Sequence, residues 1–285
     1  MAEPSAPGGG GAWLLAYTVT TPDCAASSSM GYRAPLDEAA PRLAELGYDG
    51  VEAWVRDARE VDREALQRTL DRSRLRLAAV GTGPIAAEDG LTLADVAVPE
   101  RREEAIARIE AAIELAAEHD ALVTIGRVRG SPGVEEPERR RAVVEALDRI
   151  DAAAARAGVR VVLEPQSRLV GPYLRTVAEV VEVIDDAGWQ RIGVMPDTFH
   201  MGLEERSMVA GLLAAGTRLW HVQLGDTDRS PLGLGALDTG LVADALDGVG
   251  YRGWLTMEHD QRGDSFDAAR RSARAAAAMR DRVGR

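Results

Sequence analysis

Eight short runs rich in β-branched and other apolar residues alternate with longer segments along the whole chain. The runs span residues 13–20, 50–55, 75–80, 121–125, 159–164, 192–196, 219–224 and 253–258. A chain in which short strands alternate with helices builds a parallel sheet from successive βα units. Eight units close a TIM barrel, and such barrels commonly form one domain of about 250 residues. We therefore predict an α/β fold, a single (β/α)8 TIM barrel over residues 13–285.

The segments between these runs have helical periodicity. In segment 100–119, apolar residues recur at spacings of three and four positions, and similar patterns predict helices at 138–157, 176–186 and 266–283. Glycines precede several predicted strands, where a helix C-terminus favours a residue in the left-handed conformation. These glycines are Gly47, Gly158, Gly188 and Gly216.

Three further segments fall outside this pattern. Residues 1–12 are rich in Gly, Pro and Ala and lack the basic and apolar regions of a signal peptide, so we expect a disordered tail. The connections 81–99 and 225–238 are longer than a minimal βα loop. Because βα loops form the active-site face of a barrel, we expect them to act as lid or pocket, with a disordered insertion as the alternative.

Acidic residues end three of the last four predicted strands. They are Glu164, Asp197 and Glu258, separated in turn by one and two βα units. The C-terminal ends of barrel strands meet at one mouth, where three carboxylates repel strongly unless a cation neutralises them. The alternative is that each acid forms its own ion pair with an arginine.

The seventh strand lies between the last two acids and offers His221 and Gln223 on one face, because strand side chains alternate with period two. Gln223 is nearer the C-terminal end, and its amide oxygen is a ligand for hard cations. An oxygen-rich set favours Mg²⁺ or Mn²⁺ over zinc. We predict one divalent ion held by Glu164, Asp197, Gln223 and Glu258.

Two histidines are candidate substrate contacts. His200 follows Asp197 by three residues, although a His that merely caps the following segment is the alternative. His221 lies deeper on its strand, where a supporting hydrogen bond is as well favoured as contact with substrate. His119 and His259 are expected at the surface or in loops.

Arginines leave the predicted strands on the same side of the barrel. Arg127 and Arg129 follow the fourth strand and Arg229 lies in the long loop after the seventh. Guanidinium groups there could clamp a carboxylate or phosphate. A solvated or ion-paired arginine is the commoner case for any one of them, so only their location favours Arg129 and Arg229 as substrate contacts.

Composition excludes several classes of function. The formal net charge of −12 opposes attraction to nucleic acid. All 34 basic residues are Arg, which excludes Schiff-base chemistry on lysine, and the single Cys24 excludes an internal disulfide framework. No apolar run approaches the roughly 20 residues of a membrane helix. We expect a soluble, cytoplasmic protein; a homo-oligomer is compatible with the sequence.

Four segments resemble the xylose-isomerase-like TIM barrels, the superfamily of sugar phosphate isomerases and epimerases, inosose dehydratases and endonuclease IV. They are Ala-Val-Gly-Thr-Gly at 79–83, Asp-Gly-Leu-Thr-Leu at 89–93, Ile-Gly-Arg-Val-Arg-Gly at 125–130 and Asp-Thr-Phe-His-Met at 197–201. These motifs look most like those of ketose 3-epimerases and relatives that act on keto-sugar acids such as 5-keto-gluconate. The resemblance runs from Trp13 to the C-terminus.

This resemblance implies a Mn²⁺, Mg²⁺ or Co²⁺ ion bound by Glu, Asp, His and Glu. The two glutamates, here Glu164 and Glu258, would also act as acid and base. The ion would polarise the carbonyl and a neighbouring hydroxyl of the substrate and stabilise a cis-enediolate. The resemblance thus implies a metal-dependent isomerase or epimerase of a ketose or keto-sugar acid.

Two departures from the family pattern keep other reactions open. Gln223 stands where the epimerases carry the second His of His-x-His, and Val170 stands where they carry Glu. Both favour the alternative of a lyase that dehydrates an inosose or 3-dehydroshikimate by the same metal-enolate chemistry. A non-catalytic binding protein and a phosphodiester hydrolase of the endonuclease IV kind are less favoured, the latter because it needs many more histidines.

Overall fold

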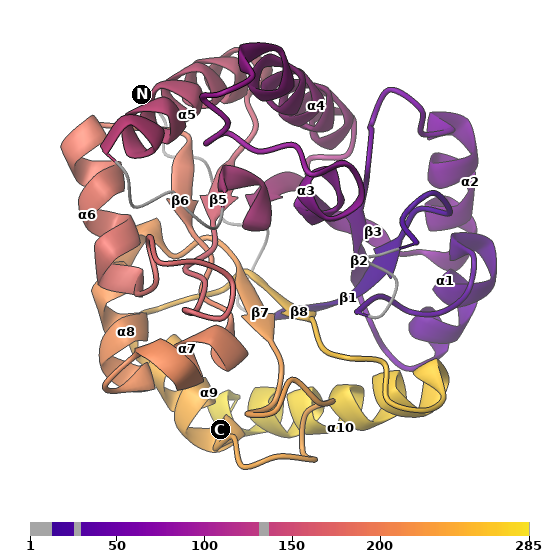
Figure 1. The fold of residues 1–285 in the computed structure, drawn as a ribbon. Helices are drawn as coiled ribbons and strands as arrows, with labels where there is room; N and C mark the ends of the chain where they lie inside the picture. The colour runs from indigo at the N-terminus through magenta and orange to yellow at the C-terminus, as the bar shows by residue number, and fades with distance from the viewer. Residues whose placement is uncertain (1–12, 26–29, 131–136, 285) are drawn as a thin grey trace.

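Eight parallel strands form a ring that is surrounded by helices, so the predicted (β/α)8 TIM barrel is confirmed (Figure 1). The computed structural model describes residues 13–25, 30–130 and 137–284. The predicted tail, residues 1–12, lies outside the described residues. Neighbouring strands pair in the order β6-β5-β4-β3-β2-β1-β8-β7. Isolated bridges from Val194 to Leu219 and from Asp197 to Gln223 join the two ends of this series.

All eight predicted strands form, within a few residues of their expected bounds. They are β1 (Leu14–Thr20), β2 (Gly50–Trp54), β3 (Arg76–Gly81), β4 (Leu122–Ile125), β5 (Val161–Leu163), β6 (Ile192–Val194), β7 (Val222–Leu224) and β8 (Trp254–Met257). Strands β5, β6 and β7 are shorter than expected, and β7 begins three residues later than predicted.

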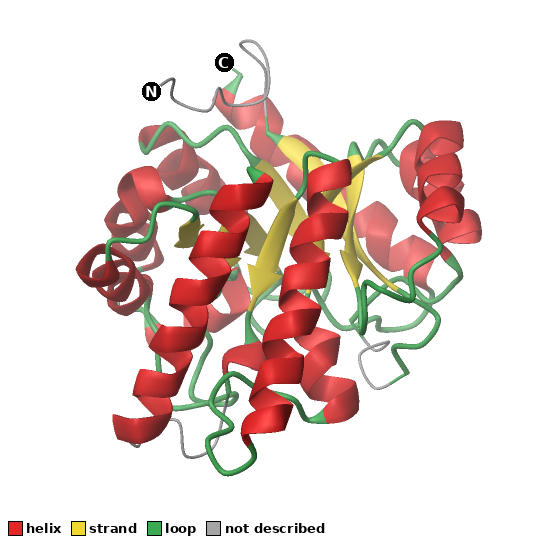
Figure 2. Cartoon of the chain, turned by 90° about the horizontal axis from the view of Figure 1, so that it is seen from above, coloured by secondary structure: helices red, strands yellow, loops and turns green. Residues whose placement is uncertain are grey.

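Most of the helices cover the outside of the strand ring, as the view in Figure 2 shows, and the short helices α3 and α7 lie at one end of it (Figure 1). They are α1 (Leu36–Glu45), α2 (Arg63–Ser73), α3 (Gly83–Asp89), α4 (Pro99–Glu118), α5 (Pro137–Ala157), α6 (Val177–Ala187), α7 (Thr198–Glu204), α8 (Met208–Ala215), α9 (Thr239–Gly248) and α10 (Ser265–Val283), with the 3-10 turns η1 (Arg127–Arg129) and η2 (Gly216–Arg218). Among the described residues, no helix is long and apolar enough to cross a membrane.

The four glycines predicted at helix ends all have positive φ, between 51° and 85°. At Gly188, which ends α6, the left-handed conformation lets its N–H bond to the last turn of the helix. The opposite end of α6 has a capping box, in which Thr176 and Glu179 satisfy each other's backbone N–H groups. The sequence of α6 therefore contains both a signal that starts the helix and a signal that ends it.

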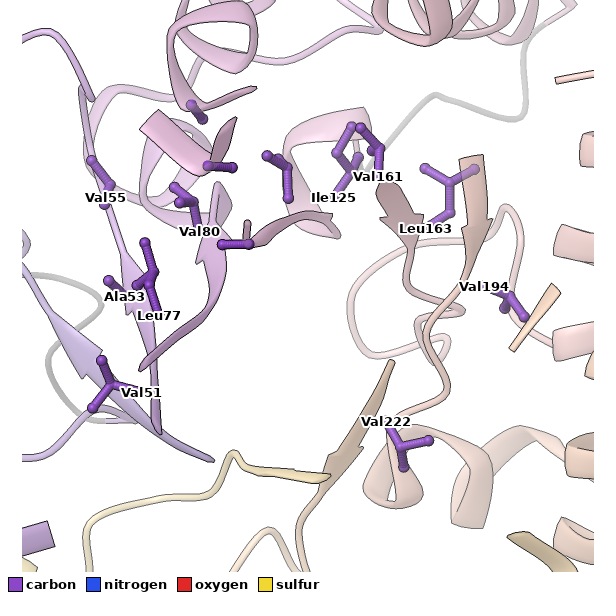
Figure 3. Packing of buried hydrophobic residues seen from close by; sticks show 14 of the residues in the cluster. Val51, Ala53, Val55, Leu77, Val80, Ile125, Val161, Leu163, Val194 and Val222 are labelled. Atoms are coloured by element: carbon purple, nitrogen blue, oxygen red, sulfur yellow. The ribbon is translucent and has the colours of Figure 1, made fainter. Parts of the chain in front are cut away.

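Strand side chains alternate between the helices and the barrel interior. Outward residues such as Val161, Leu163 and Val222 belong to the large apolar cluster that packs the strands against the helices (Figure 3). The inward neighbours Val162 and Met195 belong to a second, smaller cluster. Side chains two positions apart on a strand point to the same side. A polar residue that follows an inward apolar residue by two positions is therefore directed toward the barrel mouth.

Cys24 follows β1 and is 2% exposed. Burial raises the pKa of its thiol to about 11, although a hydrogen bond with Thr21 opposes this. Since the thiolate is the reactive form, we expect Cys24 in the native protein to react with a disulfide reagent at pH 8 about 100-fold more slowly than in urea. Equal rates in native and denatured protein would contradict this burial.

Candidate functional site

Polar side chains converge at the barrel mouth from four consecutive strands, β5 to β8. Glu164 follows β5 directly and Glu258 follows β8 directly, both at inward parity. Asp197 follows β6 and is the N-cap of α7, and Gln223 lies in the middle of β7. The backbone N–H of Gln223 donates to Pro196 over 2.9 Å, which holds the ends of β6 and β7 together.

Glu164, Asp197 and His200 form a compact buried group. Each offers one ligand atom, and these atoms lie within 4.8 Å of one another. Oδ1 of Asp197 accepts a hydrogen bond from the N–H of Phe199 over 2.7 Å, which caps α7. Because capping uses Oδ1, the second oxygen of Asp197 remains free to bind another group.

Neighbouring side chains orient the Glu164 carboxylate. Nε2 of Gln166 donates to its Oε2 over 2.7 Å, and Nε2 of His200 lies 3.3 Å from its Oε1. The backbone N–H of Ser167, which can only donate, points to Nδ1 of His200 over 3.3 Å. Nδ1 of His200 is therefore placed to accept, whereas its Nε2 faces the Glu164 carboxylate.

A guanidinium group lies among these acids. Nη2 of Arg229 contacts Glu258 and lies 3.4 Å from Oδ2 of Asp197, and Nη1 lies 3.2 Å from Nε2 of His200. The guanidinium also stacks on the ring of Phe199, 4.8 Å from its centroid. Arg229 itself has a φ of 58°, which turns the loop after β7 back over the mouth.

The carboxylates carry more negative charge than one arginine balances. Burial raises the pKa of Glu258 well above its usual range, and the charge of Arg229 only partly opposes this. Burial also raises the pKa of Asp197. The pKa of Glu164 is lowered, because the hydrogen bond from His200 and the nearby positive charges outweigh its burial. A further cation at this position would stabilise all three ionised acids.

Four oxygens at the mouth are buried and receive no hydrogen bond from the described residues: Oε1 of Glu164, Oε1 of Gln166, Oδ2 of Asp197 and Oε1 of Gln223. A buried acceptor without a partner costs about 1–3 kcal/mol, so such atoms call for an explanation. All of them except that of Gln166 belong to the predicted ligand set. The residues present thus fit a hard divalent cation, which prefers carboxylate and amide oxygens.

A cavity of about 310 Å³ opens over these residues. Glu164, His200, Gln223, Arg229 and Glu258 line its polar side. Its remaining walls are mainly apolar and include Met30, Trp54, Ala87, Leu169, Val170 and Phe199. Both long connections contribute, the first through Gly83 and Ala87 and the second through Arg229, in agreement with the expectation that they form pocket.

Three sequence-based placements need correction. Arg129 does not line the cavity; it is 2% exposed and its Nη2 donates to the carbonyl of Leu174 over 3.2 Å, whereas Arg127 lines the cavity. His221 is fully buried and its Nε2 bonds to Glu52, so it has the supporting role rather than the substrate contact. His259 is fully buried, not at the surface, and its Nε2 lies 3.1 Å from Oγ of Ser272.

Sequence reasoning missed Glu52, Gln166 and Phe199. Glu52 lies in the middle of β2 with no exposed surface, and it accepts a hydrogen bond from Gln223. An acid inside an otherwise apolar strand was the available signal, since buried acids are rare unless paired. Gln166 and Phe199 carry no such signal, because their roles depend on the geometry of the turns after β5 and β6.

Gly126, directly after β4, leaves room for the site. A Cβ at this position would overlap the Glu164 carboxylate and lie 2.8 Å from Nε2 of Gln166. We expect Gly126→Ala to displace Glu164 and lower kcat/KM about 100-fold, which steady-state kinetics would measure. Gly202→Ala in α7 is the control, because a Cβ there meets no atom within 4 Å. Equal activity of the two variants would refute this role of Gly126.

Comparisons with known proteins agree with this geometry. The sequence profile described as "Xylose isomerase-like TIM barrel" matches residues 40–282. The chain is 30% identical to an L-ribulose 3-epimerase of Methylomonas sp. (strain DH-1) over 216 residues, 75% of either chain. It is 33% identical to a D-psicose 3-epimerase of Enterocloster bolteae over 124 residues, 44% of this chain and 41% of that protein.

Solved structures share the fold along almost the whole chain. A D-allulose 3-epimerase from Methylomonas sp. superposes with a TM-score of 0.80 at 22% identity, over 95% of this chain and 99% of that one. A 3-keto-D-glucoside 4-epimerase from E. coli gives a TM-score of 0.76 at 22% identity, over 93% and 98% of the two chains. At these identities the likeness establishes the fold.

Proposed function

Because the chain belongs to the xylose isomerase-like TIM-barrel family and is an enzyme of its sugar isomerase and epimerase group, we propose that it epimerises or isomerises a ketose or keto-sugar acid with one divalent ion. The observation that carries this proposal is the placement of Glu164 and Glu258 on one cavity, beside buried oxygens of Asp197 and Gln223 that lack hydrogen bonds.

The proposed ligands of the ion are Glu164, Asp197, Gln223 and Glu258. Because all four offer oxygen, Mn²⁺ or Mg²⁺ is favoured, with Co²⁺ as a further candidate. When bound, such an ion supplies Lewis-acid polarisation of the substrate carbonyl and of the hydroxyl beside it. His200 lies within the same group, so its ring nitrogen is a further candidate ligand.

The protein's own residues perform the proton transfers. One of the two glutamates removes the proton from the carbon between carbonyl and hydroxyl, and the other returns a proton to the opposite face. Gln166 and His200 hold the Glu164 carboxylate in one orientation through the contacts described above, so it meets the substrate in a fixed direction. His200 lines the cavity, so its ring can hydrogen-bond to a substrate hydroxyl.

The cavity walls support a substrate that differs from a standard ketohexose. Val170 and Leu169 line the cavity where the family pattern has polar and aromatic groups. Arg127 is exposed at the rim and lines the cavity, so its guanidinium can pair with a carboxylate. These two features favour a keto-sugar acid within the broader class of ketoses. The relatives reported above are named epimerases and give no support to the dehydratase alternative.

Isotope exchange tests the proposal directly. Protein loaded with Mn²⁺ is incubated in D₂O with a panel of ketoses and keto-sugar acids, and carbon-bound deuterium is measured by NMR and mass spectrometry. We expect deuterium at the epimerised carbon of at least one substrate. If protein shown to hold Mn²⁺ incorporates none across a broad panel, the proposal fails. A conjugated product with ultraviolet absorbance would instead indicate dehydration.

A further inference from the structure

Gln223 can act as a ligand only if its side chain presents oxygen to the cavity. An amide has two ends of nearly equal size, and only the carbonyl oxygen binds a cation. If the –NH₂ end faced Asp197 and the ion, it would repel the cation. Something in the barrel must therefore select the orientation of this side chain.

Glu52 is the group in contact with the other end of the amide. It projects from β2 into the barrel interior and has no exposed surface. Its Oε1 accepts from Nε2 of Gln223 over 2.8 Å and from Nε1 of Trp54 over 3.2 Å. Its Oε2 lies 3.0 Å from Nε2 of His221. The side chain thus joins β2 to β7 across the inside of the barrel.

The contact from Trp54 determines which end of Gln223 faces Glu52. An indole nitrogen can only donate, so Oε1 of Glu52 acts as an acceptor in this contact. Gln223 must then approach it with its –NH₂ group, because two oxygens 2.8 Å apart without a proton between them repel. Oε1 of Gln223 is consequently turned away, and it is the buried oxygen that lacks a hydrogen bond.

We propose that Glu52 is a positioning residue that makes Gln223 an oxygen ligand, by holding its –NH₂ group away from the ion. This inference rests on the proposed function, since it assigns a role within the same cation site. A hydrogen bond from the amide to a carboxylate also increases the electron density on the amide oxygen. Glu52 does not reach the cavity and so acts only through Gln223.

Metal titration of four proteins tests whether Glu52 acts in this way. Wild type, Glu52→Gln, Gln223→Ala and the double variant are freed of metal, and the Kd for Mn²⁺ is measured by electron paramagnetic resonance. We expect Glu52→Gln to weaken binding about 10- to 100-fold, as is typical when the partner of a ligand is lost. In the Gln223→Ala background the same change should weaken binding less than 3-fold, because no amide remains to be oriented.

This design separates positioning from a simple effect of charge. Loss of the Glu52 charge would weaken Mn²⁺ binding equally in both backgrounds. Thr256→Val is the matched control: Thr256 is buried and pairs with Gln223 through the backbone ladder, but its Oγ1 lies 2.9 Å from Nε2 of His221 and makes no described contact with the Gln223 side chain. This variant should stay within 3-fold of wild type. Unchanged affinity of Glu52→Gln, or equal losses in both backgrounds, would overturn the inference.

A second measurement needs no variant at residue 52 and decides the matter if Glu52→Gln does not fold. The side-chain –NH₂ signals of Gln223, labelled with ¹⁵N and assigned by comparison with Gln223→Ala, should exchange slowly with solvent both with and without Mg²⁺. Rapid exchange would refute the contact with Glu52. If wild type binds no Mn²⁺ at all, the proposed function and this inference fall together, whereas normal binding by Glu52→Gln removes the inference alone.

Discussion

Glu164→Gln and Glu258→Gln are each expected to lower kcat for epimerisation by about 10³-fold, because each removes one of the two groups that exchange protons with the substrate. The amide keeps an oxygen at each position, so Mn²⁺ binding weakens but persists at saturating concentration. The two variants should differ in isotope exchange. Each retains one glutamate, which can still exchange the proton of the epimer that faces it, without converting one epimer into the other.

Incubation of each variant with each pure epimer in D₂O measures this difference. We expect Glu164→Gln to label one epimer only and Glu258→Gln to label only the other. Glu103→Gln is the control for loss of one acidic charge, since Glu103 is exposed and pairs with Arg149 on the outside of the barrel. If either catalytic variant retains full epimerisation with Mn²⁺ bound, the assignment of acid and base is refuted.

The barrel and the convergence of the acids could be predicted because both depend on local periodicity. Runs of apolar residues at regular spacing predicted eight strands, strand-end position predicted that Glu164 and Glu258 meet at the mouth, and parity added Gln223. These features follow from the alternation of side chains along a strand, which a single sequence displays. The assignment of their chemical roles stays a prediction.

The errors arose where the backbone leaves this regular pattern. Arg127 and Arg129 were expected to point the same way, as on an extended strand, but residues Arg127–Arg129 form a 3-10 turn. A turn with three residues per repeat rotates successive side chains differently, so Arg127 faces the cavity and Arg129 enters the core. The contact of Glu52 with Gln223 joins residues 171 positions apart, and no local pattern encodes that pairing.

Arg229 links the stability of the protein to the proposed ion. Its guanidinium contacts Glu258 and lies near Asp197, with a side chain that is 15% exposed. Removing one partner from a buried ion pair typically costs 3–5 kcal/mol, because the remaining charge lacks compensation.

We expect Arg229→Met, measured in the presence of a metal chelator, to lower the free energy of unfolding by about 3 kcal/mol. Its Tm should fall accordingly, as urea and thermal denaturation would measure. Arg262→Met is the control, since its ion pair with Asp228 is half exposed and contributes little to stability.

Added Mn²⁺ should then reverse the defect of Arg229→Met. An ion that binds only the folded protein stabilises it by about 2.7 kcal/mol at a concentration 100 times its Kd. In wild type the guanidinium and the ion share the same carboxylates and repel each other. Mn²⁺ therefore increases the stability of wild type less than that of Arg229→Met. The increase in Tm with Mn²⁺ should therefore be larger in Arg229→Met than in wild type or Arg262→Met. If Arg229→Met in chelator is as stable as wild type, Arg229 does not compensate the acids. If Mn²⁺ raises the Tm of all three proteins equally, Arg229 does not compete with the ion.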